Sequence, residues 1–187
     1  MNQNNHDEED QDALNEIKAL ARHEGELFLD DLTSLSDAAA AALGGHKGWL
    51  YLDGLTGLSD AAAAALARHK EADDNSVFEG SILSLDGLTS LSDAAAIALA
   101  RHAGALHLSG LTSLSDAVAA ALGGHKGWLT LSDLTGLSDA AAKALSRHQG
   151  SLTLSGLASM SDAAVEALVR HGDVELPDEF IKRIKRE

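Results

Sequence analysis

Residues 49–71 read WLYLDGLTGLSDAAAAALARHKE, and this stretch joins a strand pattern to a helix pattern within 23 residues. Its first part alternates leucine with other residues, as a half-buried β-strand does. Its second part opens with Ser59, a residue typical of a helix N-cap, and Asp60, whose charge favours the first helical turn. An alanine-rich segment then runs to Leu66. The stretch therefore predicts a strand followed by a helix of about two to three turns.

Histidines mark the interval at which this pattern recurs. Successive members of the series are 23 residues apart, except for one step of 33 residues. The series is His23, His46, His69, His102, His125, His148 and His171. Glycines such as Gly48 and Gly127 follow two residues later, and we expect them near the C′ position of each helix. Because one unit cannot bury its leucines alone, stacked units are predicted to share one core under a parallel sheet.

The repeat boundaries predict one array with distinct ends. Six full units begin at Glu26, Trp49, Ile82, Ala105, Trp128 and Ser151. We expect a disordered acidic tail over residues 1–11, the array over 12–176 with a helical half-repeat at 12–25, an insertion at about 72–81, and a capping helix over 177–187.

The repeat resembles a leucine-rich repeat, and it is similar to the 23-residue LSDAAA-type repeats of bacterial proteins. The resemblance covers about residues 12–176. It implies an α/β fold, a right-handed solenoid with a parallel sheet on the concave face and short helices on the convex face. The sequence departs from the family pattern at one position. Leucines such as Leu32 and Leu55 stand where the family usually has an asparagine that satisfies the turn after the strand.

Composition narrows the classes of partner and chemistry. The net charge of −15 disfavours nucleic acid and anionic membranes, since both attract Lys and Arg. The chain has no cysteine, which excludes a disulfide framework and a cysteine-based zinc site. It has no recognisable catalytic motif, so we expect neither an enzyme nor a cofactor. With no signal-peptide pattern and no run of about 18 apolar residues, a cytoplasmic protein is the default expectation.

Side chains between the strand leucines are predicted to face outward from the sheet. Four of the six aromatic residues fall at such positions, although other repeats hold Ala, Ser or Thr there. Exposed aromatics beside charges are typical of recognition surfaces, whereas stacking along the sheet would make them structural. We predict a partner-binding face made of Phe28, Asp30, Trp49, Tyr51, Asp53, Asp86, His107, Trp128 and Thr130. Its acidic members favour a basic or amphipathic protein or peptide.

The histidine series and the insertion carry further hypotheses. Imidazoles at the helix ends can hydrogen-bond orphan carbonyls, which is a structural role. A row of them could instead bind metal or sense pH, and protonating several together predicts destabilisation below about pH 6. In the insertion, Phe78 could pack on the array or anchor a partner.

The sequence therefore favours a non-catalytic protein- or peptide-binding module that uses the outward face of its strands. A self-assembling scaffold and a histidine-ladder metal binder or pH sensor are the alternatives. The sequence leaves the oligomeric state open.

Overall fold

A computed structural model describes residues 3–69 and 80–184 of the chain. Strands and helices alternate, and the seven strands of the described part form one parallel sheet in which they lie in chain order. The strands are β1 (Glu24–Phe28), β2 (Lys47–Tyr51), β3 (Ile82–Ser84), β4 (Ala105–His107), β5 (Leu129–Thr130), β6 (Leu152–Thr153) and β7 (Val174–Glu175). The helices are α1 (Gln3–Leu20), α2 (Asp37–Leu43), α3 (Asp60–Leu66), α4 (Asp93–Leu99), α5 (Asp116–Leu122), α6 (Asp139–Leu145), α7 (Asp162–Val169) and α8 (Asp178–Ile184).

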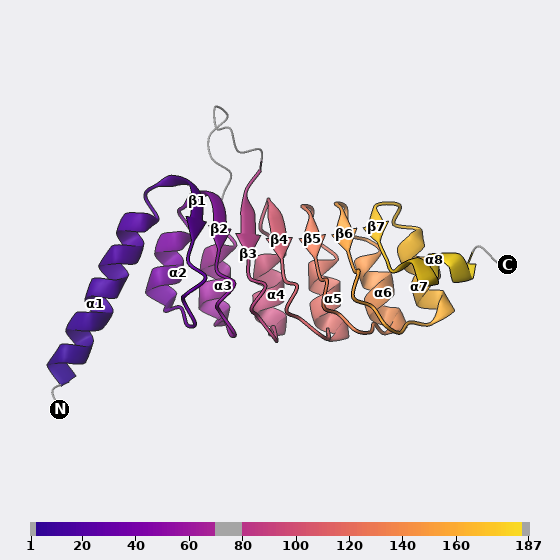
Figure 1. Ribbon diagram of the computed structural model, residues 1–187, viewed down its shortest axis with the longest axis horizontal. Helices are drawn as coiled ribbons and strands as arrows, with labels where there is room; N and C mark the ends of the chain where they lie inside the picture. Colours follow the sequence, from indigo (N-terminus) through magenta and orange to yellow (C-terminus); the bar gives the residue numbers. More distant parts are fainter. Residues whose placement is uncertain (1–2, 70–79, 185–187) are drawn as a thin grey trace.

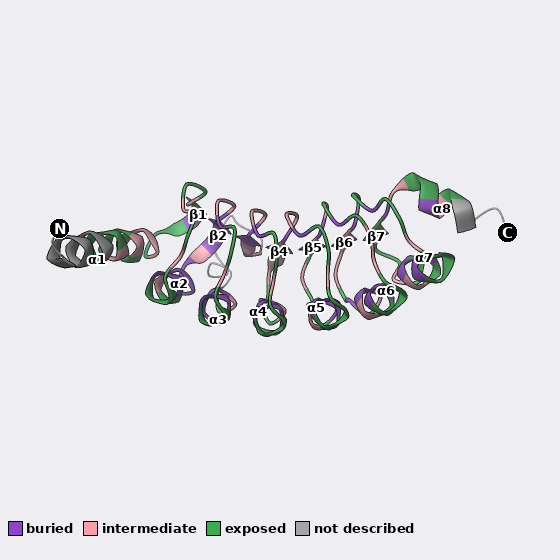
Figure 2. Cartoon of the chain, turned by 90° about the horizontal axis from the view of Figure 1, so that it is seen from below, coloured by how far each residue is buried: buried purple, intermediate pink, exposed green. Residues whose placement is uncertain are grey.

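The elements form two layers. Figure 1 shows the strands side by side along the molecule, each followed by its helix, with α1 and α8 at the two ends. Figure 2 shows that α2–α7 make a single row on one side of the sheet, with their buried residues turned towards it. The predicted α/β repeat architecture with one parallel sheet is therefore confirmed.

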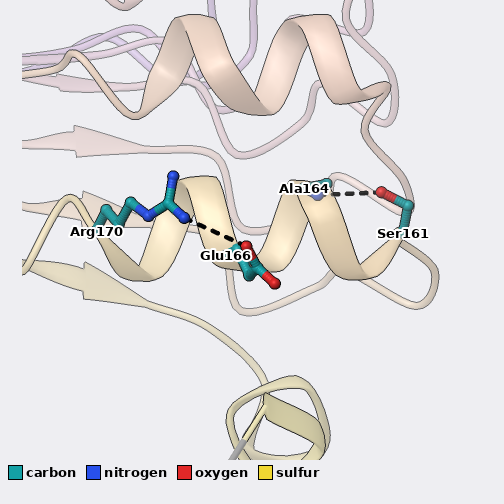
Figure 3. A network of polar contacts seen from close by, with 4 residues as sticks. All are labelled: Ser161, Ala164, Glu166 and Arg170. Atoms are coloured by element: carbon teal, nitrogen blue, oxygen red, sulfur yellow. Dashed lines mark hydrogen bonds and ion pairs between the residues drawn. The ribbon is translucent and has the colours of Figure 1, made fainter.

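Serine caps set the start of each short helix, as the sequence predicts. In α7, Ser161 Oγ accepts a hydrogen bond of 3.0 Å from the Ala164 N–H (Figure 3). The equivalent serines cap α2 to α6 in the same way. From Ser59 onward the cap hydroxyls also join two repeats: Ser59 Oγ donates to the Asp37 carboxylate at 2.5 Å, one helix back, and the later caps make the equivalent bond. The caps thus fix both the helix starts and the stacking of neighbouring repeats.

Leucine and alanine fill the space between the layers. The strand leucines Leu50 and Leu52 and the turn residue Leu55 are fully buried, as are the helix alanines Ala62 and Ala63 that face them. Alanine favours the helix and adds little bulk, so helix and sheet approach closely. Among the described residues, the only aromatic side chain in this core is Phe180, in α8 at the C-terminal end.

The glycines after the histidines have a different role from the one expected. Helix α2 has its C-cap at Gly44, whereas Gly48 lies within β2, four residues later. A Cβ atom on Gly127 would lie 1.9 Å from the backbone oxygen of Gly104, in the preceding repeat. These glycines are therefore needed because the backbones of adjacent repeats touch, not because a helix ends there.

The N-terminal segment also differs from expectation, because α1 begins at Gln3 within the supposed tail over residues 1–11. Neither glycine nor proline interrupts residues 3–20, so no strong helix breaker opposes this helix. In the described part of the chain, none of the helices has the length and apolar character needed to cross a membrane.

Candidate functional site

The face of the sheet opposite α2–α7 carries the predicted partner-binding residues, and we call it the open face. Strand register aligns its side chains in columns across the repeats. The first column holds Glu26, Trp49, Ile82 and Ala105, and the second holds Phe28, Tyr51, Ser84, His107, Thr130, Thr153 and Glu175. The intervening leucines point to the core, so strand alternation alone places these residues outward.

One aromatic cluster lies at the N-terminal end of the open face. The rings of Phe28 and Tyr51 stack with centroids 4.6 Å apart and planes 7° from parallel. Phe28 remains 60 % exposed, because β1 is an edge strand and the partner ring covers one face only. Trp49 lies on β2 in register with Glu26, and its indole N–H donates to the Gly80 carbonyl at 3.2 Å.

A second cluster forms around Trp128, three strands further along. The Trp128 ring meets the His107 ring edge-on, with centroids 6.2 Å apart, and its indole N–H donates to Thr153 Oγ1 at 3.3 Å. The side chain is still 54 % exposed. Thr130 lies in register with His107 on the neighbouring strand. Three strand spacings, about 14 Å, separate Tyr51 on β2 from Trp128 beside β5. An elongated partner is therefore needed to reach both clusters.

The predicted acidic residues have partners within the protein. Asp53 Oδ1 accepts hydrogen bonds from the Asp86 N–H at 2.9 Å and from the Ser84 hydroxyl at 2.6 Å. Asp30 Oδ1 likewise accepts from the Asp53 N–H at 3.1 Å, and Asp86 Oδ1 from the Ser109 N–H at 2.6 Å. These carboxylates link each repeat to the next. The aspartates therefore satisfy backbone groups beside the strand ends, a duty that the sequence analysis did not assign to them.

Electrostatics distinguish the N-terminal cluster. Burial raises the pKa of Tyr51, and the negative charges of Glu26, Asp53 and Asp30 raise it further. Glu26 was not singled out by sequence reasoning, although its place in the first outward column was a signal that could have found it. Phe78, the remaining predicted site residue, lies outside the described residues.

The histidine series forms a row of stacked imidazoles at the edge of the core. The rings of His46, His69, His102, His125, His148 and His171 follow one another with centroids 5.5 to 6.4 Å apart and planes within 20° of parallel. The first five are at most 4 % exposed. His46 Nε2 lies 3.0 Å from the carbonyl oxygen of Gly25, which belongs to strand β1 and not to the end of a helix, so this contact differs from the predicted one with orphan helix carbonyls.

The environment of this row disfavours charge on the rings. Burial, followed by the neighbouring imidazoles His102 and His46, lowers the pKa of His69 to about 3. Burial and His125 lower the pKa of His102 to about 4, although backbone groups of His69 and Ala105 oppose the change. Burial also lowers the pKa values of His125 and His148. This environment therefore holds the rings of His69, His102, His125 and His148 neutral at physiological pH.

The described residues include no group of three or more His, Cys, Asp or Glu side chains placed to hold a metal ion. Parallel rings present their faces to one another, so their nitrogens do not converge on one point. The geometry of the row does not fit the metal-binding alternative.

Comparison with known proteins adds no relative. The chain matches no protein-family model, and a search of curated proteins finds no similar sequence.

Proposed function

We propose that this chain is a leucine-rich-repeat solenoid that binds a protein or peptide on its open face, without catalysis. The repeat pattern and the parallel sheet support the fold assignment. Figure 2 adds further support, because the helices are spaced more widely than the strands, as they are when the sheet lines the inner side of a curve. The open face would then be the concave face.

The observation that carries the functional proposal is the exposure of two large aromatic side chains on this face, Phe28 at 60 % and Trp128 at 54 %. The core contains almost no aromatic residues, and other repeats place alanine, serine or threonine at the equivalent outward positions. Exposed aromatic side chains leave apolar surface in contact with water, which is unfavourable for a monomer. They are also the residues that most often anchor a partner. Contacts along the sheet account for part of each ring but leave the rest uncovered.

The proposed role requires no catalytic group. In the described repeats the serines cap helices and the first-turn aspartates accept bonds from the next cap. The cap serines and first-turn aspartates thus have local structural partners.

Affinity capture with matched variants tests the proposal. The double variant Phe28→Ala, Trp128→Ala removes the two exposed anchors, whereas the control Ile97→Ala, Val169→Ala removes two exposed apolar side chains from helices on the other face. We expect the wild type and the control to retain the same protein from a native lysate, and the first variant to bind that protein at least about 30-fold more weakly. Circular dichroism checks that both variants fold. Equal retention by all three proteins would refute the proposed binding face.

A self-assembling scaffold is the second candidate, because β1 and β7 are the edge strands of the sheet in the described part of the chain. Glu24 and Glu26 on β1 oppose edge-to-edge pairing, as charged edge residues commonly do. Light scattering after gel filtration separates the candidates: a monomer at all concentrations supports the binding module, and concentration-dependent growth supports the scaffold.

A further inference from the structure

The outer surface of the Phe28 ring is an aromatic platform with one uncovered side. Tyr51 stacks on the inner side at a centroid distance of 4.6 Å, and among the described residues β1 is the edge strand of the sheet. The platform is flat and open, because a single ring faces the solvent. A flat ligand group can stack on this ring, whereas a single ring does not enclose a group that requires a pocket of several aromatic side chains.

Carboxylates surround this platform. Glu26 lies two residues before Phe28 in β1, so strand alternation puts both on the open face. Asp30 follows in the turn after β1. Asp53 lies two residues after Tyr51. Burial raises the pKa of Tyr51, and the negative charges of Glu26, Asp53 and Asp30 raise it further. Lys47 lies on the same face at the start of β2, and its ammonium group is 3.5 Å from the Glu24 carboxylate, two residues before Glu26.

We propose that the Phe28–Tyr51 ring pair and the Glu26 carboxylate form a subsite for the guanidinium group of an arginine on the bound protein or peptide. Aromatic faces attract cations, and arginine is found on them more often than lysine. The planar guanidinium stacks flat on a ring while its N–H groups donate in pairs to a carboxylate at the side. Glu26 fits this role better than Asp30, because one oxygen of Asp30 already accepts the Asp53 N–H.

The inference rests on the proposed function and specifies the chemistry of one anchor on the partner. It predicts that a bound segment places an arginine at the N-terminal end of the open face. The Trp128 cluster, about 14 Å away, would contact a different part of the same segment.

The single tyrosine of the chain provides a selective probe of this subsite. With 3-fluorotyrosine incorporated, Tyr51 gives one ¹⁹F NMR signal. We expect acetyl-Gly-Arg-Gly-amide to shift this signal in a saturable manner, at concentrations on the order of 100 mM, since one exposed cation–π contact gives weak binding. The peptide with citrulline in place of arginine has the same shape without the charge. At matched ionic strength, we expect it to bind about three- to tenfold more weakly.

Three variants assign the effect to the proposed groups. Glu26→Gln and Phe28→Leu should each weaken binding of the arginine peptide by about three- to fivefold. Asp133→Asn removes one exposed carboxylate elsewhere and should leave binding unchanged. The subsite is refuted if the arginine peptide causes no shift, if citrulline acts equally, or if Glu26→Gln matches Asp133→Asn. If the capture experiment succeeds and this titration fails, the open face remains the binding surface and only the arginine anchor is wrong.

Discussion

Acidification should unfold this protein through its histidine row. An imidazole in the unfolded chain takes up a proton below its usual pKa of 6.5, whereas His69 and His102 stay neutral in the folded protein down to about pH 3 and about pH 4. Below pH 6.5 the unfolded state therefore binds more protons than the folded state. The stabilisation is fully present above pH 6.5, and it is lost as the pH falls towards the lowered pKa values.

The size of the effect follows from the lowered pKa values of His69 and His102. Between pH 8 and pH 5, each of these two rings reduces the free energy of unfolding by about 2 kcal/mol, because 1.5 pH units separate pH 5 from the pKa of the unfolded chain. Together they remove about 4 kcal/mol, and His125 and His148 add to the loss in the same direction. For a chain of this length, the melting temperature should fall by roughly 10 °C.

Urea unfolding at pH 8 and pH 5, monitored by circular dichroism, measures the loss directly. His102→Gln should reduce the pH-dependent part by about 2 kcal/mol, since it removes one buried titrating ring. His23→Gln makes the same replacement at an exposed histidine of the series and should retain the wild-type pH dependence. The loss of unfolding free energy between pH 8 and pH 5 is compared among the three proteins, because the contribution of the carboxylates is common to all of them and cancels. The reasoning is refuted if the wild type has equal unfolding free energies at pH 8 and pH 5. It is also refuted if His102→Gln loses as much unfolding free energy between these pH values as the wild type does.

Substitutions of Gly127, Asp53 and Ser92 test the contacts between repeats by denaturant unfolding at neutral pH. Gly127→Ala should destabilise the fold by more than about 2 kcal/mol, because the new Cβ would lie 1.9 Å from a backbone oxygen, while Gly57→Ala, with open space around it, should change stability by less than about 0.5 kcal/mol. Asp53→Ala should cost about 1–3 kcal/mol through loss of two hydrogen bonds, and Asp53→Asn should cost less, since an acceptor oxygen remains; equal losses would contradict this role. Ser92→Ala should cost about 1 kcal/mol through loss of the α4 cap, and an unchanged unfolding midpoint would count against it.

Much of the architecture follows from local rules that the sequence states in every repeat. The serine caps, the helix ends at leucine and the outward columns were predictable, because N-capping depends on neighbouring residues and strand alternation has a period of two. The stacking of identical units follows as well, since no unit can bury its leucines alone. The exposed positions of Phe28 and Trp128 were predictable from the same strand alternation and repeat stacking.

Other features depend on distances between repeats, which the sequence does not contain. The helix over the acidic N-terminal segment was missed because its composition is also that of a disordered tail. The role of Gly48 and Gly127 came from close approach of two backbones. The use of Asp53 as a link between repeats required the neighbouring N–H groups to lie within hydrogen-bond reach of its side chain.

The sequence by itself determined the period, the alternation of strand and helix, and which side chains leave the core, because each depends on residues adjacent along the chain. Only the tertiary structure decided that the imidazoles of His69, His102, His125 and His148 stack as buried neutral rings, and that Phe28 has one covered and one open side. Both depend on the spacing and tilt of units about 23 residues apart, which are fixed by packing across the sheet and between the helices.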